Sequence, residues 1–237
     1  MTITSWNTAH NYGMAILAIL FTVYPSVYPF VIFAIFSFTM LWIIRWKDIM
    51  NLKPPGGYPN YVTMFRLAGT ISVVLISASL ENIVISSIMM LLVILDGLDG
   101  YLARRFHHGT DFGSIFDMET DAFFVCIVSC LLLKKEMVPE WILVPAFIKY
   151  IFTVAMHVTS LEKMAEKKTK FGAAIAAIMF ISLSVAFILP DKMRYFTLLV
   201  AGSLICISFA VSFIRILKTG NYGPRFKVRS KIDPSAH

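Results

Sequence analysis

Four aspartates are the residues of this chain whose types and spacing could most readily do chemistry. Asp96 and Asp99 are three residues apart at the end of an apolar run, and Asp117 and Asp121 are four apart further along. Because successive residues of an α-helix turn by about 100°, each pair shares one helical face. Glu119 points roughly 200° away from Asp117, so we expect it to stand outside the site and Glu119→Gln to be nearly silent.

The surroundings of these carboxylates make ordinary solvation difficult. The run at 83–95, just before Asp96, is almost wholly apolar. A charged side chain in the middle of a membrane costs about 2.5–3.5 kcal/mol on insertion scales, so protons, basic side chains or metal ions must neutralise the four aspartates. Two divalent cations would balance them, and metals about 3.5–4 Å apart are a usual arrangement for transfer at phosphorus. All-oxygen ligands favour Mg²⁺ or Mn²⁺ over zinc.

The composition of the whole chain indicates a membrane protein. Of its 237 residues, 58% are hydrophobic and 15% are charged, against about 45–50% and about 25% in ordinary soluble domains. This excludes a large soluble domain and a disordered chain, and the lack of alternating apolar and polar segments excludes a porin. We therefore predict an all-α fold, a polytopic membrane helix bundle.

Apolar segments of spanning length divide the chain into three parts. The stretch 12–44, which Pro25 and Pro29 interrupt, is either one long broken helix or a hairpin of two. A connector rich in Pro and Gly follows, and then six segments near 61–80, 83–104, 115–133, 140–158, 171–189 and 195–216. We expect one or two N-terminal membrane segments with a connector at 1–58, a six-helix core at 59–217 and a basic cytoplasmic tail at 218–237.

The basic residues indicate how the bundle is oriented. The connector, the loop at 105–112, the break at 161–170 and the tail lie on one side, to which we also count Arg66. The opposite side carries few basic residues, namely Lys134, Lys135, Lys192 and Arg194. By the positive-inside rule the richer side is cytoplasmic. Loop charges then account for the net charge of +7, and we expect no nucleic-acid partner.

The four aspartates belong to a longer pattern. The segment reads D-x-x-D-G-x-x-A-R, then eight residues, then G-x-x-x-D-x-x-x-D, with fixed positions Asp96, Asp99, Gly100, Ala103, Arg104, Gly113, Asp117 and Asp121. It resembles the signature of the CDP-alcohol phosphatidyltransferases, and eight specified positions match by chance on the order of 10⁻¹⁰ per start point. Members of that family join the phosphoryl-bearing part of a CDP-linked substrate to an alcohol and release CMP.

The resemblance implies a role for each matched residue. Asp96, Asp99, Asp117 and Asp121 would hold two Mg²⁺ or Mn²⁺ ions, and Asp121 would accept the proton of the attacking hydroxyl. The small and basic positions would contact the nucleotide or its diphosphate, namely Gly100, Ala103, Arg104 and Gly113. The segment P-N-Y-V-T-M-F-R at 59–66 resembles the start of the first core helix in bacterial members and adds Asn60 and Thr63 as diphosphate contacts. The alternative for Asn60 is a helix N-cap.

Three lysines are candidates for binding the acceptor. Lys149 lies roughly 12 Å from either end of its segment, so it should face the bundle interior and meet an acid or a substrate phosphate. Lys168 and Lys170 precede the fifth core helix, where bacterial members often carry basic residues near the acceptor pocket. Ordinary positive-inside charge is the alternative for these two.

These observations predict an integral-membrane phosphotransferase of phospholipid synthesis, in a bacterial inner membrane with its site facing the cytoplasm. We expect CDP-diacylglycerol as donor and a small alcohol or alcohol phosphate as acceptor, with glycerol 3-phosphate favoured. The resemblance also implies a homodimer among membrane lipids. One alternative is an enzyme of the same fold that joins a soluble CDP-alcohol to a lipid hydroxyl. Another is a divalent-metal transporter in which the four aspartates form the transport site.

Overall fold

The computed structural model describes residues 2–50, 57–106, 110–159 and 170–220, and their side chains other than those at 48, 98–106, 170 and 218–220. All regular structure in these residues is helical, which confirms the predicted all-α fold. In chain order the elements are α1 (Ile3–Val23), α2 (Tyr28–Ile44), α3 (Trp46–Met50), α4 (Tyr58–Ile76), α5 (Asn82–Phe106), α6 (Asp111–Lys134), the 3₁₀ turn η1 (Glu140–Ile142), α7 (Leu143–Val158), α8 (Lys170–Val185) and α9 (Asp191–Gly220).

The N-terminal segment is a hairpin of two helices, one of the two arrangements that the sequence left open. α1 begins at Ile3, well before the apolar stretch, because the Thr2 side chain accepts a hydrogen bond from the backbone N–H of Ser5 at 3.1 Å. Pro25 lies in the turn between the helices. Pro29 lies in the first turn of α2, where its missing N–H removes no helical hydrogen bond.

Each of the six segments expected for the core is helical, with small shifts at the ends. Helix α4 begins at Tyr58, three residues earlier than expected, after Gly57 in the N-cap position. Gly57 has a φ of 73°, a left-handed conformation that glycine adopts without strain. The alternative that Asn60 is the N-cap was therefore wrong, because Asn60 lies inside the first turn.

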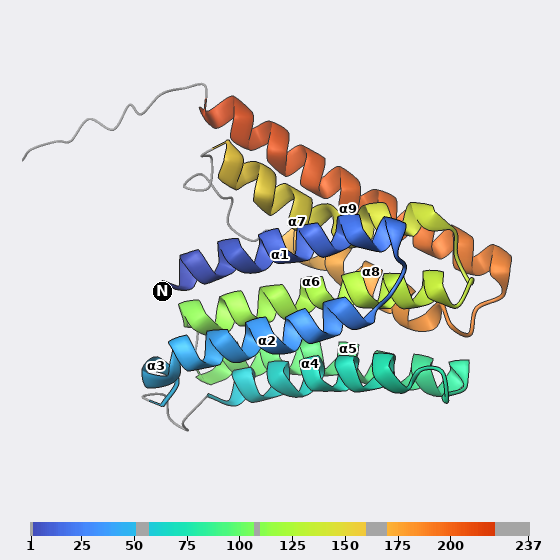
Figure 1. Ribbon diagram of the computed structural model, residues 1–237, viewed down its shortest axis with the longest axis horizontal. Coiled ribbons are helices and arrows are strands. Elements are labelled where there is room, and N and C mark those ends of the chain that lie inside the picture. Colours follow the sequence, from blue (N-terminus) through green and yellow to red (C-terminus); the bar gives the residue numbers. More distant parts are fainter. Residues whose placement is uncertain (1, 51–56, 107–109, 160–169, 221–237) are drawn as a thin grey trace, which may run out of the picture.

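Helix α6 lies in the middle of the bundle (Figure 1). It contacts α2, α4, α7 and α8, and every side chain from Phe123 to Leu132 is buried. A helix that is covered on all sides needs apolar residues all round, which explains why α6 has no polar face after Asp121. Around it, α1 packs against α7, α4 against α5, and α8 against α9.

The outer surfaces of the bundle fit a membrane protein. In the described part of the chain, three helices are long and apolar enough to cross a bilayer, namely Tyr58–Ile76, Glu140–Val158 and Asp191–Leu217. Shorter apolar helices occupy Tyr28–Ile44, Asn82–Gly97 and Phe171–Val185. Large apolar side chains such as Ile19, Val23 and Phe171 are exposed on the outside, where lipid would cover them. The number of spans beyond these three stays a prediction.

Candidate active site

Three of the four predicted metal ligands come together in the structure. Asp96 from α5 and Asp117 and Asp121 from α6 each offer one carboxylate oxygen, and these oxygens all lie within 4.8 Å of one another. We call these three residues the aspartate cluster. Asp117 and Asp121 share one face of α6, as their four-residue spacing predicted.

The guanidinium of Arg66 lies among these carboxylates. Its Nη1 is 2.6 Å from Asp96 Oδ1 and 3.3 Å from Asp117 Oδ1, and its Nη2 is 2.7 Å from Asp121 Oδ1. The side chain of Arg66 is only 5% exposed, whereas those of the aspartates are 27–30% exposed. A buried cation therefore offsets one of the three negative charges of this partly open cluster, which is one of the solutions that the sequence required.

Helix α4 is placed to deliver this cation, because it packs against both α5 and α6. Arg66 was not predicted as a site residue from the sequence and was counted among the cytoplasmic charges. The signal was present in the spacing of Asn60, Thr63 and Arg66, which follow each other every three residues and share a helical face. All three are buried in the structure, which a loop-side arginine would not be.

Helices α4 and α6 approach each other closely at their first turns, before the aspartate cluster. Thr110 caps α6 by accepting a hydrogen bond from the backbone N–H of Gly113 at 3.0 Å. A Cβ atom at Gly113 would lie 2.7 Å from Asn60 Oδ1 and 3.2 Å from Thr110 Oγ1, so the absence of a side chain permits this approach. Thr63 donates from Oγ1 to the carbonyl oxygen of Pro59 at 3.1 Å. The diphosphate contacts expected of Asn60, Thr63 and Gly113 remain predictions.

Several predicted site residues lie where the structure gives no side chain. Four positions of the signature are helical residues of α5 whose side chains are outside the description, namely Asp99, Gly100, Ala103 and Arg104. Lys170 is the first residue of α8 and is in the same situation, and Lys168 lies outside the described residues. The roles expected of these six residues stay predictions.

Lys149 faces the bundle interior, as predicted, and meets an acid. Its Nζ contacts Glu119 Oε2 and donates to Asn11 Oδ1 at 2.8 Å. Glu119 is fully buried and is not part of the aspartate cluster, as expected from its direction on α6. The expectation that Glu119→Gln would be nearly silent needs correction, because removing one partner of a buried ion pair costs about 3–5 kcal/mol. An acceptor role for Lys149 stays a prediction.

The aspartate cluster and Arg66 together define the chemistry of this end of the bundle. Clustered carboxylate oxygens are hard ligands, which bind cations such as Mg²⁺ and Mn²⁺ better than soft metals. A carboxylate among them is also a base for a nearby hydroxyl, provided that it reaches the hydroxyl within hydrogen-bonding distance. The arrangement therefore suits reactions in which a negatively charged group, such as a diphosphate, meets a cation and an alcohol.

Comparisons with known proteins cover the same part of the chain. A family model described as CDP-alcohol phosphatidyltransferase matches residues 57–214. The curated relatives include the CDP-diacylglycerol–glycerol-3-phosphate 3-phosphatidyltransferase of Rickettsia typhi, 36% identical over 86 residues (35% of this chain and 48% of the relative). The protein of the same name from Rickettsia bellii is 35% identical over 92 residues (38% and 51%).

A eukaryotic relative also matches, the CDP-diacylglycerol–inositol 3-phosphatidyltransferase of Schizosaccharomyces pombe. It is 32% identical over 108 residues, which are 46% of this chain and 32% of the relative. The chain spans about half the length of the bacterial relatives that it matches. No solved structure matches the chain significantly.

Proposed function

Since this chain belongs to the CDP-alcohol phosphatidyltransferase family, we propose that it transfers a phosphatidyl group from CDP-diacylglycerol to a small alcohol or alcohol phosphate and releases CMP. The observation that carries the proposal is the convergence of Asp96, Asp117 and Asp121 from two helices. Glycerol 3-phosphate is the acceptor that we favour, because the Rickettsia relatives are named for it. Transfer to inositol, for which the fission yeast relative is named, is the nearest alternative acceptor.

Divalent metal ions fit the aspartate cluster. The donor set is all oxygen, and a guanidinium already lies between the three carboxylates at 2.6–3.3 Å, so the group attracts a cation. We propose that the cluster, with Asp99 as a fourth ligand, holds two Mg²⁺ or Mn²⁺ ions. When bound, such ions stabilise negative charge on phosphoryl oxygens and on the departing phosphate.

The residues of the chain would do the rest of the chemistry. The hydroxyl oxygen of the acceptor forms a bond to the phosphorus that carries diacylglycerol, and the bond from this phosphorus to the oxygen of CMP breaks. CMP leaves with the bonding electron pair, and the hydroxyl proton goes to Asp121. Arg66 donates to Asp121 Oδ1 at 2.7 Å until a metal takes its place, so Asp121 keeps a positively charged partner that orients its carboxylate. Fixing the base in place contributes to the rate because reacting groups must lie about 3–3.5 Å apart.

The predicted membrane arrangement is part of the proposal. Six core helices at 59–217 would span a bacterial inner membrane, with α1 and α2 as additional N-terminal segments and 218–237 as a basic tail. The aspartate cluster would face the cytoplasm, where the acceptor and CMP are soluble, while the acyl chains of the donor stay in the bilayer. Lys149, Lys168 and Lys170 remain candidates for the acceptor phosphate, and a homodimer is expected from the family alone.

The test is a reconstituted assay on the purified full-length protein. We would supply Mg²⁺, CDP-diacylglycerol and, separately, glycerol 3-phosphate or inositol, and measure CMP and the new lipid by mass spectrometry. We expect CMP and one new phospholipid, and loss of both when EDTA removes the metal. A parallel reaction with a soluble CDP-alcohol and diacylglycerol tests the alternative in which the donor is the soluble CDP-alcohol and the acceptor is the lipid hydroxyl.

A matched pair of variants connects this activity with the site. Asp117→Asn changes the aspartate cluster, whereas Asp111→Asn changes an exposed aspartate on the same helix. We expect CMP release to fall at least a hundredfold in Asp117→Asn and to stay near wild type in Asp111→Asn. Metal flux into proteoliposomes without CMP release would contradict the proposal and favour the transporter.

A further inference from the structure

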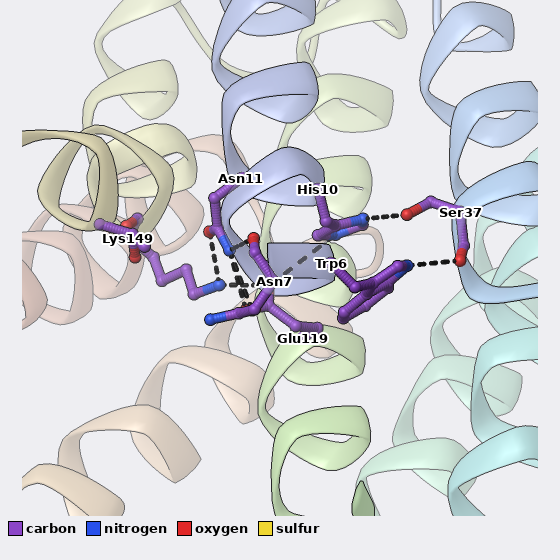
Figure 2. A network of polar contacts seen from close by, with 8 residues as sticks. Trp6, Asn7, His10, Asn11, Ser37, Glu119 and Lys149 are labelled. Carbon is purple, nitrogen blue, oxygen red and sulfur yellow. Dashed lines mark hydrogen bonds and ion pairs between the residues drawn. The ribbon is translucent and has the colours of Figure 1, made fainter. Parts of the chain in front are cut away.

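A second group of polar side chains lies on the face of α6 that carries Glu119 (Figure 2). Its centre is Glu119, whose side chain has no exposed surface. Lys149 from α7 contacts Glu119 Oε2, and Asn11 from α1 donates from Nδ2 to Glu119 Oε1 at 3.1 Å. Asn11 also accepts from Lys149 at 2.8 Å, so each of the three residues bonds the other two. We call Glu119, Lys149 and Asn11 the Glu119 network.

The N-terminal hairpin connects this network to α2. His10 lies on α1 beside Asn11 and forms a hydrogen bond through Nδ1 to Ser37 Oγ at 2.8 Å. Trp6, one turn earlier, donates from Nε1 to the carbonyl oxygen of Ser37 at 2.8 Å and stacks on His10 with ring centroids 5.0 Å apart. Both helices of the hairpin lie before the family match at 57–214, yet they supply Asn11 and the side chains that hold α1.

Helix α6 is therefore bound to a cation on each of two opposite faces, the buried Arg66 and the partly buried Lys149. Arg66 from α4 bonds Asp117 and Asp121, and Lys149 from α7 bonds Glu119, which lies between them in sequence. A side chain at the helix surface lies about 5 Å from the axis, so a rotation of about 10° moves its carboxylate by about 1 Å. Binding and catalytic groups need to be held within about 0.5 Å, so rotation of α6 matters for the aspartate cluster.

Stability alone is a weak reason for such a network. Replacing a buried ion pair by apolar residues of similar volume is often neutral or stabilising for the fold. The better-supported role of buried polar groups is to hold packed helices in one relative position. Here the arrangement that is fixed includes the two aspartates on α6. Residues that hydrogen-bond directly to a metal ligand typically change metal affinity or activity 10–100-fold, so a network that acts through the helix should give an effect at the low end of this range.

We propose that the Glu119 network fixes the rotation of α6 and so orients the carboxylates of Asp117 and Asp121 for metal binding. The N-terminal hairpin, which supplies Asn11, then contributes to the geometry of the active site. Glu119, Lys149 and Asn11 are then positioning residues, and for Lys149 this role is the alternative to binding the acceptor phosphate. The inference rests on the proposed function in one respect, because it takes the aspartate cluster to bind divalent metal.

The test replaces the ion pair without leaving an unpaired charge. The double variant Glu119→Leu with Lys149→Met is apolar and similar in volume, and Asn11→Leu is a milder variant that keeps the ion pair. Ser86→Ala is the matched control, because it removes a buried hydrogen bond, 2.8 Å to the carbonyl oxygen of Ser184, between α5 and α8. For each full-length protein we would measure the unfolding temperature and the affinity for Mn²⁺ by electron paramagnetic resonance, and then the Mg²⁺ dependence of CMP release.

We expect the double variant to unfold within a few degrees of wild type and to bind Mn²⁺ about tenfold more weakly, with Asn11→Leu changed in the same direction. Ser86→Ala should lose a few degrees and keep its Mn²⁺ affinity. Wild-type Mn²⁺ affinity in both network variants would overturn the positioning role while leaving the proposed function intact. Absence of Mn²⁺ binding by the wild-type chain would overturn both.

Discussion

Arg66→Gln tests whether a guanidinium and a divalent metal neutralise the same carboxylates. In the structure the guanidinium of Arg66 contacts all three members of the aspartate cluster, so a metal that binds these oxygens must compete with it. Without metal, the variant leaves the carboxylates to repel one another. With metal bound, the repulsion is relieved in the variant as well. The loss of stability should therefore depend on whether metal is present.

The size of the effect follows from the geometry. One pair of charges 4 Å apart is worth about 4 kcal/mol at an effective dielectric constant of about 20. Arg66 has three partners, but these are 27–30% exposed, and the cost of burying the guanidinium offsets much of the attraction. We therefore take the low end of the range for breaking a buried pair, about 3 kcal/mol. For a chain of this length, that loss lowers the unfolding temperature by about 6–12 °C.

The assay is thermal unfolding of the purified full-length protein in EDTA and in saturating Mn²⁺. We expect Arg66→Gln to lose about 6–12 °C in EDTA and to recover most of this loss in Mn²⁺, so that Mn²⁺ stabilises the variant more than the wild type. Arg194→Gln is the matched control, because Arg194 is also buried and donates to the carbonyl oxygens of Ala186 and Leu189, both at 2.7 Å, and its carboxylate partner, the exposed Asp191, is not part of the aspartate cluster. It should lose stability equally in both conditions. The same metal-independent loss in Arg66→Gln would refute the competition.

Three further substitutions test separate parts of the structure. Asp121→Asn should reduce CMP release by about 10²–10⁴-fold without impairing expression, and retained turnover would remove Asp121 from the role of base. Gly113→Ala should lower the free energy of unfolding by about 1–3 kcal/mol, because the new Cβ would lie 2.7 Å from Asn60 Oδ1. Chemical denaturation measures this free energy, and an unchanged value would mean that Asn60 moves aside. Ser37→Ala removes the hydrogen bond from its Oγ to His10, and a loss of about 1 kcal/mol is expected; no loss would show that His10 finds another partner.

The fold and much of the site could be predicted from the sequence because both depend on local patterns. Apolar runs and their breaks gave the helices, and the three- and four-residue spacings gave the faces that carry Asp96, Asp117 and Asp121. The ends of helices were less predictable, since they depend on single residues such as Thr2 and Gly57. The hairpin at the N-terminus stayed undecided because prolines permit both a kink and a turn.

Pairing between distant residues could not be predicted. Arg66 was attributed to the cytoplasmic side because positive charge in a membrane protein usually lies there. Its three-residue spacing from Thr63 and Asn60, which places all three on one face of α4, indicated instead that it is a site residue. The direction of Glu119 was predicted correctly, but its burial was not, because the partners that surround it come from α1 and α7. For Lys149 the sequence predicted burial and left its partner open between an acid and a phosphate, and only the packing of α6 on α7 identifies the acid.

The long sequence separation within the Glu119 network has a consequence for how the protein is made. Glu119 and Lys149 follow Asn11 by 108 and 138 residues, so at 5–20 residues per second the ribosome completes Lys149 roughly 7–28 s after Asn11. Meanwhile the hairpin has its own partners, since Asn11 donates to the carbonyl oxygen of Asn7 at 2.8 Å and His10 bonds Ser37. Asn11 and His10 can therefore be hydrogen-bonded within the hairpin early, and the arrival of α6 and α7 completes the Glu119 network.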